Sequence, residues 1–290
     1  MKHTDTLPFR VSIPPLRWLF GVLILFASLA SLAAPARAAD RGRIEAFLQV
    51  TGFDVALDSI AFSAGAAPKM LGIEPGLFGS EWERLSKEVF DTDEMRALGL
   101  VILEPTLRDE ALDHAAEFYA SDLGQRLVVA ENQSQMLEDD SAKQAEGKQI
   151  LADLSDSDPG RIKALERMNG SIDAAGSSLR ALQEIQFRFL MAASAAGVVE
   201  LRTDADELRA LLKQNEAALR EAIRASALAG SAYIYRDFTD EEIVAYTEAL
   251  DHPLMQEVYE LLNAVQYEIM ANRFEILAAR MAELRPGQDI

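Results

Sequence analysis

The stretch DEALDHAAEFYASDLGQ at residues 109–125 decides the fold, because a second version of it, DEEIVAYTEALDHPLMQ, occupies residues 240–256. The two versions align without a gap at an offset of 131 positions. Each has acidic residues, apolar residues three and four apart, a break and a closing Gln, and that apolar spacing is typical of an amphipathic helix facing a core. Because a repeated unit sets the architecture of a protein, we expect an all-α fold of two related helical units packed as an irregular bundle.

Each version is expected to form a helix–break–helix corner. In the first, Tyr119 ends a helix, Ser121 caps the next one with its side-chain oxygen, and Gly124 allows close approach of the backbone. In the second, His252 takes the capping position and Pro253 the first helical position, where its missing N–H costs nothing. The residues that we assign to these corners, as a candidate ligand site or structural feature, are Phe118, Tyr119, Ser121, Gly124, Gln125, Pro253 and Gln256.

Similarity between the two halves extends beyond the corners. Residues 44–52 resemble residues 162–170, and each stretch reads as a short helix that its final Gly closes in the left-handed conformation. The turn SDSDPG at residues 155–160 marks a boundary between the halves. We therefore expect a first helical unit at residues 39–154 and a second, divergent unit at residues 155–290.

Several expected helix starts carry a side chain that can cap them. Thr239 and Glu242 have the spacing of a capping box, in which each side chain satisfies a free N–H group of the first turn. Asp158 precedes a Pro that suits the first helical position. Thr92 and Thr106 each precede acidic residues, which favours an oxygen cap followed by negative charge at the positive end of a helix.

Residues 1–38 have the order of a secretory signal peptide. A basic start is followed by an apolar run of 17 residues, from Trp18 to Ala34, and by the small-residue site ARA at residues 36–38. Cleavage is expected after Ala38; the alternative is a retained N-terminal anchor, because the run is at the low edge of the length that spans a bilayer. We expect a periplasmic protein with no stable membrane span once the signal is removed.

The charge and composition narrow the classes of partner. Residues 1–38 contain four basic residues and one acidic residue, so 24 basic and 46 acidic residues remain after them, a net charge of −22. Such a charge repels nucleic acid and anionic lipid headgroups, and it is also ordinary for a soluble exported protein. The sequence contains no Cys, which excludes disulfides, Cys-based metal sites and thiol chemistry.

The first corner resembles an uncharacterised bacterial family, the domain of unknown function 2059, in a Phe-Tyr-x-Ser-Pro-x-Gly-Gln signature. The matching residues are Phe118, Tyr119, Ser121, Gly124 and Gln125. Asp122 stands where the family has Pro. The second corner keeps Pro253 and Gln256 and departs at Ala249, Leu250, His252 and Met255.

Residues 47–54 also look like the opening helix of that family. The resemblance covers most of the chain after residue 38 as two tandem copies, of which the second is divergent. It implies a helical, exported protein. Because the family has no established activity, the resemblance implies no mechanism.

One set of residues is a candidate metal site. Glu110, His114 and Glu117 lie at i, i+4 and i+7, so their side chains share one face of the expected helix. Carboxylate and imidazole groups on a bundle helix can bind a transition metal, but the usual pattern there is Glu-x-x-His, and this spacing is longer. The alternative is a solvated acidic helix face.

No convergent catalytic set accompanies the repeated corners. The leading hypothesis is therefore a non-enzymatic binding or protein-interaction factor of the cell envelope that needs no cofactor. Its partner would be another envelope protein, or an apolar peptide or lipid held in a groove between the units. The alternative is a metal-dependent or hydrolytic periplasmic enzyme that uses Glu110, His114 and Glu117.

Overall fold

The described part of the chain is folded almost entirely into helices. The computed structural model describes residues 39–73, 79–137, 140–174 and 176–284. Within these ranges it contains no strand, which confirms the predicted all-α class. The predicted signal peptide lies outside the described residues.

The helices follow one another through short connections. Their bounds are α2 Arg41–Val50, α3 Phe53–Ser63, the 3-10 turn η1 Ala64–Ala66, α4 Ala67–Met70, α5 Gly79–Val89, α6 Thr92–Thr106, α7 Asp109–Ala120, α8 Asp122–Gln135, α9 Asp140–Ser157, α10 Pro159–Ile172, α11 Ser177–Ala195, α12 Ala205–Gln214, α13 Glu216–Ile234, α14 Asp240–Leu250 and α15 Pro253–Met281.

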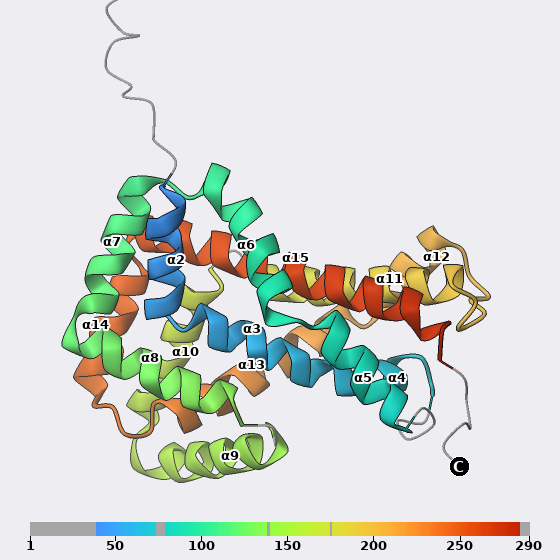
Figure 1. Ribbon diagram of the computed structural model, residues 1–290. Helices are drawn as coiled ribbons and strands as arrows, with labels where there is room; N and C mark the ends of the chain where they lie inside the picture. Colours follow the sequence, from blue (N-terminus) through green and yellow to red (C-terminus); the bar gives the residue numbers. More distant parts are fainter. Residues whose placement is uncertain (1–38, 74–78, 138–139, 175, 285–290) are drawn as a thin grey trace, which may run out of the picture. The chain divides into compact units, whose positions relative to one another are not determined.

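The 29-residue helix α15 forms the centre of the core. It packs along α11, as Figure 1 shows, and it also contacts α5, α6 and α7. Phe274 illustrates this position: its ring meets Phe90 at a centroid distance of 5.6 Å and Phe189 at 5.5 Å, both edge to face. Such aromatic pairs add stabilisation beyond the apolar area they bury.

Helices from the two predicted halves share this core. Besides the contacts of α15 with α5, α6 and α7, α9 packs along α13. Residues Ala38–Ile290 form one compact unit. That the ranges 39–154 and 155–290 are tandem copies stays a prediction.

Two of the predicted helix starts are confirmed in atomic detail. Asp158 accepts a hydrogen bond from the backbone N–H of Arg161 (3.1 Å), with Pro159 in the first turn of α10. Thr239 and Glu242 form the capping box of α14.

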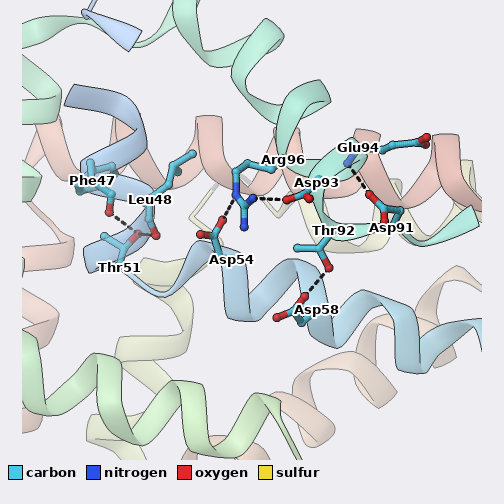
Figure 2. A network of polar contacts seen from close by, with 10 residues as sticks. All are labelled: Phe47, Leu48, Thr51, Asp54, Asp58, Asp91, Thr92, Asp93, Glu94 and Arg96. Atoms are coloured by element: carbon cyan, nitrogen blue, oxygen red, sulfur yellow. Dashed lines mark hydrogen bonds and ion pairs between the residues drawn. The ribbon is translucent and has the colours of Figure 1, made fainter. Parts of the chain in front are cut away.

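The prediction that Thr92 caps a helix is wrong. Asp91 takes that position and accepts from the N–H of Glu94 (3.0 Å), whereas the hydroxyl of Thr92, in the first turn of α6, donates to Asp58 (Figure 2). The same region carries the ion pair between Arg96 and Asp54 on α3 (2.7 Å). The start of α6 is therefore fixed by contacts to α3 that no local pattern shows.

The cap predicted at Thr106 is also wrong. Helix α6 continues through Thr106, whose hydroxyl donates back to the carbonyl of Ile102 (2.5 Å). Arg108 precedes α7 and makes no capping hydrogen bond with its side chain. It instead forms a two-point ion pair with Glu257 on α15, so a tertiary contact holds the start of α7.

The two glycines predicted to close equivalent helices differ in conformation. Gly52 has a φ of 73°, in the left-handed region, as predicted. Gly170 lies inside α10, which continues to Ile172, and the left-handed residue comes later, at Gly176 with a φ of 58°. The resemblance of residues 44–52 to 162–170 therefore does not extend to the backbone turn.

None of the helices in the described residues is long and apolar enough to cross a membrane.

Candidate functional site

The α7–α8 corner has the predicted construction. The Ser121 hydroxyl accepts a hydrogen bond from the N–H of Gly124 (3.1 Å) and caps α8. A Cβ at Gly124 would lie 2.3 Å from the carbonyl oxygen of Phe118 and 2.7 Å from the Cα of Tyr119. Only Gly allows the two helices to approach this closely. The exposed Gln125 completes the corner by donating to the carbonyl of Ala120 (3.3 Å).

The α14–α15 corner reaches a similar shape with different residues. His252 accepts the N–H of Leu254 at its Nδ1 atom (3.3 Å), and Pro253 occupies the first turn of α15. Gln256 donates to the carbonyls of Leu250 and Ser171. In both corners the Gln amide therefore satisfies a carbonyl at the end of the preceding helix, which gives the shared Gln a structural role.

The three candidate metal ligands are not brought together as a site. Glu110 pairs with Arg108 (3.4 Å), Glu117 is exposed, and His114 stacks on His252 with ring centroids 3.9 Å apart. Among the described residues, no group of three or more His, Asp or Glu side chains is arranged to hold a metal ion. The stacked histidines were not foreseen, because they occupy different positions in the aligned versions.

A buried polar cluster lies next to the first corner. The Glu131 carboxylate on α8 accepts hydrogen bonds from the hydroxyls of Tyr235 (2.7 Å) and Tyr246 (3.1 Å) through its Oε1 atom. Tyr246 also bonds to the Tyr259 hydroxyl (2.7 Å), which in turn bonds to Tyr119. We call these five residues the Glu131–tyrosine cluster.

The cluster joins segments that are far apart in the sequence. Tyr119 and Glu131 come from α7 and α8, whereas Tyr235 follows α13 and the other two tyrosines come from α14 and α15. Phe118 of the first corner extends the cluster by stacking on Tyr246, with centroids 5.8 Å apart and planes at 5°.

Burial controls the protonation of this cluster. It raises the pKa of Glu131 above the ordinary value, although the hydroxyls of Tyr235 and Tyr246 partly oppose the shift. It also raises the pKa of Tyr119, Tyr235 and Tyr246 well above the ordinary value for a phenol. The tyrosines therefore remain neutral near pH 7 and act as hydrogen-bond donors, not as bases.

An open pocket of about 440 Å³ adjoins the cluster. Glu131, Tyr235, Tyr246 and Tyr259 contribute to its wall, together with polar residues of α8, α9 and α13. Its volume is within the range of small-ligand sites, which combine a largely apolar wall with a few placed polar groups.

Two serines, Ser226 and Ser231, line this wall, and Ser231 is not set up for nucleophilic attack. Ser231 donates its hydroxyl to the amide oxygen of Asn169 (2.6 Å), which cannot accept a proton as a general base. Nucleophilic catalysis needs a hydroxyl next to such a base. The pocket therefore offers hydrogen-bond acceptors and neutral phenols, a combination that suits binding.

A second pocket, of about 540 Å³, lies between α8 and residues 233–238. Gln125 and Asp122 line it, so the first corner borders both a pocket and the buried cluster. Arg126 in its wall pairs with Glu242 on α14 and lies over the Phe238 ring at 5.5 Å.

Sequence reasoning found the corner but missed most of the cluster. Of its members, only Tyr119 was assigned to a site. A signal for Glu131 existed: it lies four residues after the buried Leu127 and three before the buried Ser134, on the core-facing side of α8. A carboxylate at such a position needs donors, but those donors come from distant segments.

The chain matches no curated protein and no solved structure. Residues 89–153, which include α6 to α8, most of α9 and Glu131, match the model of a family described as an uncharacterized protein conserved in bacteria, DUF2059.

Proposed function

We propose that this chain is an exported, non-enzymatic binding protein of the bacterial cell envelope, which holds a small ligand in the pocket beside Glu131. The observation that carries the proposal is the pocket itself, whose wall includes a partly buried carboxylate held by tyrosine hydroxyls. Polar groups fixed in advance within a frame of packed helices are typical of ligand sites.

The proposed compartment rests on the N-terminal sequence. Residues 1–38 combine a basic start, an apolar run and the small-residue site ARA. The family match is to a protein conserved in bacteria, so the proposed destination is the periplasm.

Ligand retention tests the proposed binding. Native mass spectrometry of the protein purified from the envelope should show a species heavier than the polypeptide, and unfolding should remove the added mass. Gly230→Met is the matched variant: a Cβ at Gly230 meets only Gln144 Nε2, at 3.8 Å, and a longer side chain extends into the pocket that Gly230 lines. Equal added mass on both proteins would contradict the proposal.

Fractionation tests the proposed compartment. The protein should appear in the periplasmic fraction with Ala39 as its first residue. Recovery from the cytoplasm with residues 1–38 intact would contradict export.

Elemental analysis of the same preparation separates binding from the enzymatic alternative. A stoichiometric transition metal that is lost in His114→Ala would favour a metal-dependent enzyme over the proposal.

A further inference from the structure

The pocket beside Glu131 has an acidic wall. Its lining residues, all within the described ranges, include two carboxylates, Glu131 and Asp140, and contain no Lys, Arg or His. Asp140 pairs with Lys143 at 2.7 Å, so its charge is already balanced. Glu131 has no cationic partner, since among the described residues its donors are the hydroxyls of Tyr235 and Tyr246.

One Glu131 oxygen is free to receive a ligand. The Oε1 atom accepts both tyrosine hydroxyls, and no described residue donates to Oε2. The side chain is partly exposed and lines the pocket. A carboxylate in this position favours a positively charged group with N–H donors, because charge-assisted hydrogen bonds are the strongest that a ligand can form with it.

Gln135 provides a second unused acceptor. It lies one helical turn after Glu131 on α8 and lines the same pocket. Its Oε1 atom is buried and has no hydrogen-bond partner. An unsatisfied buried acceptor is unfavourable, and a ligand donor would satisfy it once the Gln135 side chain turns its Oε1 atom into the pocket.

The pocket is poorly suited to anions. A ligand carboxylate or phosphate would meet Glu131 without any basic side chain in the wall to offset the repulsion. Unpaired like charges in a partly buried site oppose binding strongly. The chemistry of the wall therefore selects for a donor-bearing cation.

On the basis of the proposed function, we propose that the pocket binds a small organic cation, whose ammonium or guanidinium N–H groups donate to Glu131 Oε2 and Gln135 Oε1. The aromatic rings of Tyr235, Tyr246 and Tyr259 complete the wall around it.

Calorimetric titration with cadaverine, a five-carbon diamine, tests this ligand class. Wild-type protein should bind one equivalent. Glu131→Gln should weaken the affinity by about tenfold or more, because it removes the charge that pairs with the ammonium group. The matched control is Glu117→Gln, which removes one carboxylate from an exposed position away from the pocket and should change the affinity less than about twofold.

Two further variants keep the test valid if Glu131→Gln unfolds, which circular dichroism would reveal. Gln135→Leu should weaken cadaverine binding by removing the unsatisfied acceptor, and Gly230→Met should abolish it by filling the pocket. Equal cadaverine binding by the wild type and all folded variants would overturn the inference, because it would show only general attraction to an acidic chain.

A neutral probe distinguishes failure of the inference from failure of the proposed function. If N-phenyl-1-naphthylamine binds the wild type but not Gly230→Met, and cadaverine binds neither, the pocket is a ligand site and the cationic class is wrong. If neither probe binds and native mass spectrometry shows no retained ligand, both proposals fail.

Discussion

At the scale of single residues, Gly124 sets how closely α7 and α8 approach. Gly124→Ala should lower the free energy of unfolding by about 1–3 kcal/mol, because its Cβ would meet backbone atoms that cannot rotate away. Urea denaturation measures this change. Gly170→Ala is the control, because Gly170 lies inside α10 and an added Cβ there has no atom within 4 Å. This substitution should raise the free energy of unfolding by about 0.5–1 kcal/mol. Equal effects of the two substitutions would contradict the close approach.

Glu131 should make stability depend on pH. Burial raises its pKa in the folded state above 4.5, so the folded protein keeps this proton at pH values where the unfolded chain has lost it. The contribution of Glu131 to stability is therefore complete below pH 4.5 and is lost as the pH rises through the folded pKa.

Glu131→Gln removes this titration. Relative to the wild type, the variant should gain stability as the pH rises above 4.5, by up to about 1.4 kcal/mol per pH unit until the folded group has ionised. Denaturation curves measured between pH 4 and pH 8 give this difference. A difference that stays constant over the range would show that the folded pKa is not raised.

At the scale of helices, α9 and α13 are held close by a small residue on each side. A Cβ at Gly147 would lie 2.0 Å from the carbonyl oxygen of Ala229. Gly147→Ala should therefore push α9 away from α13, lower the free energy of unfolding by about 1–3 kcal/mol and speed amide exchange along α9. Gly230→Ala is the matched control, since it lies on α13 facing Gln144 at an ordinary contact distance. Amide exchange along α9 that is no faster in Gly147→Ala than in the wild type would contradict this account.

The helix ends show which features of the fold the local sequence determines. Asp158 and Thr239 cap their helices as predicted because the cap, the first turn and the donor lie within four residues of one another. Thr106 fails as a cap because α6 continues past the proline at Pro105, and the ion pair of Arg108 with Glu257 fixes the next start. Contacts between distant segments decided what the local pattern could not.

At the scale of the whole molecule, helices from both halves of the sequence share one core, so they should unfold together. In the protein that begins at Ala39, Trp82 on α5 is the only tryptophan. Its fluorescence and the far-ultraviolet circular dichroism, which reports all helices, should give coincident urea transitions. Loss of fluorescence at a lower urea concentration than the loss of helix would show that the first half unfolds separately.

The same mixing of segments explains why the candidate site was largely hidden in the sequence. The all-α class, both corners and the role of Gly124 depend on local spacing and could be predicted. The Glu131–tyrosine cluster depends on Glu131 of α8 meeting Tyr235, which follows α13, and Tyr246 of α14. Both tyrosines are more than 100 positions away from Glu131 in the sequence. Buried tyrosine hydroxyls require hydrogen-bond partners, but the sequence does not show which acceptor each hydroxyl meets.

The position of α15 has a consequence for how this chain is made. Helices α5, α6 and α7 bury their apolar faces against a helix that spans residues 253–281. A ribosome therefore completes the first helices long before their packing partner exists, and contacts that distant form late in folding. Until residue 281 has emerged, the growing chain exposes apolar surface that a chaperone can bind, and the native packing of α5, α6 and α7 becomes possible only after that point.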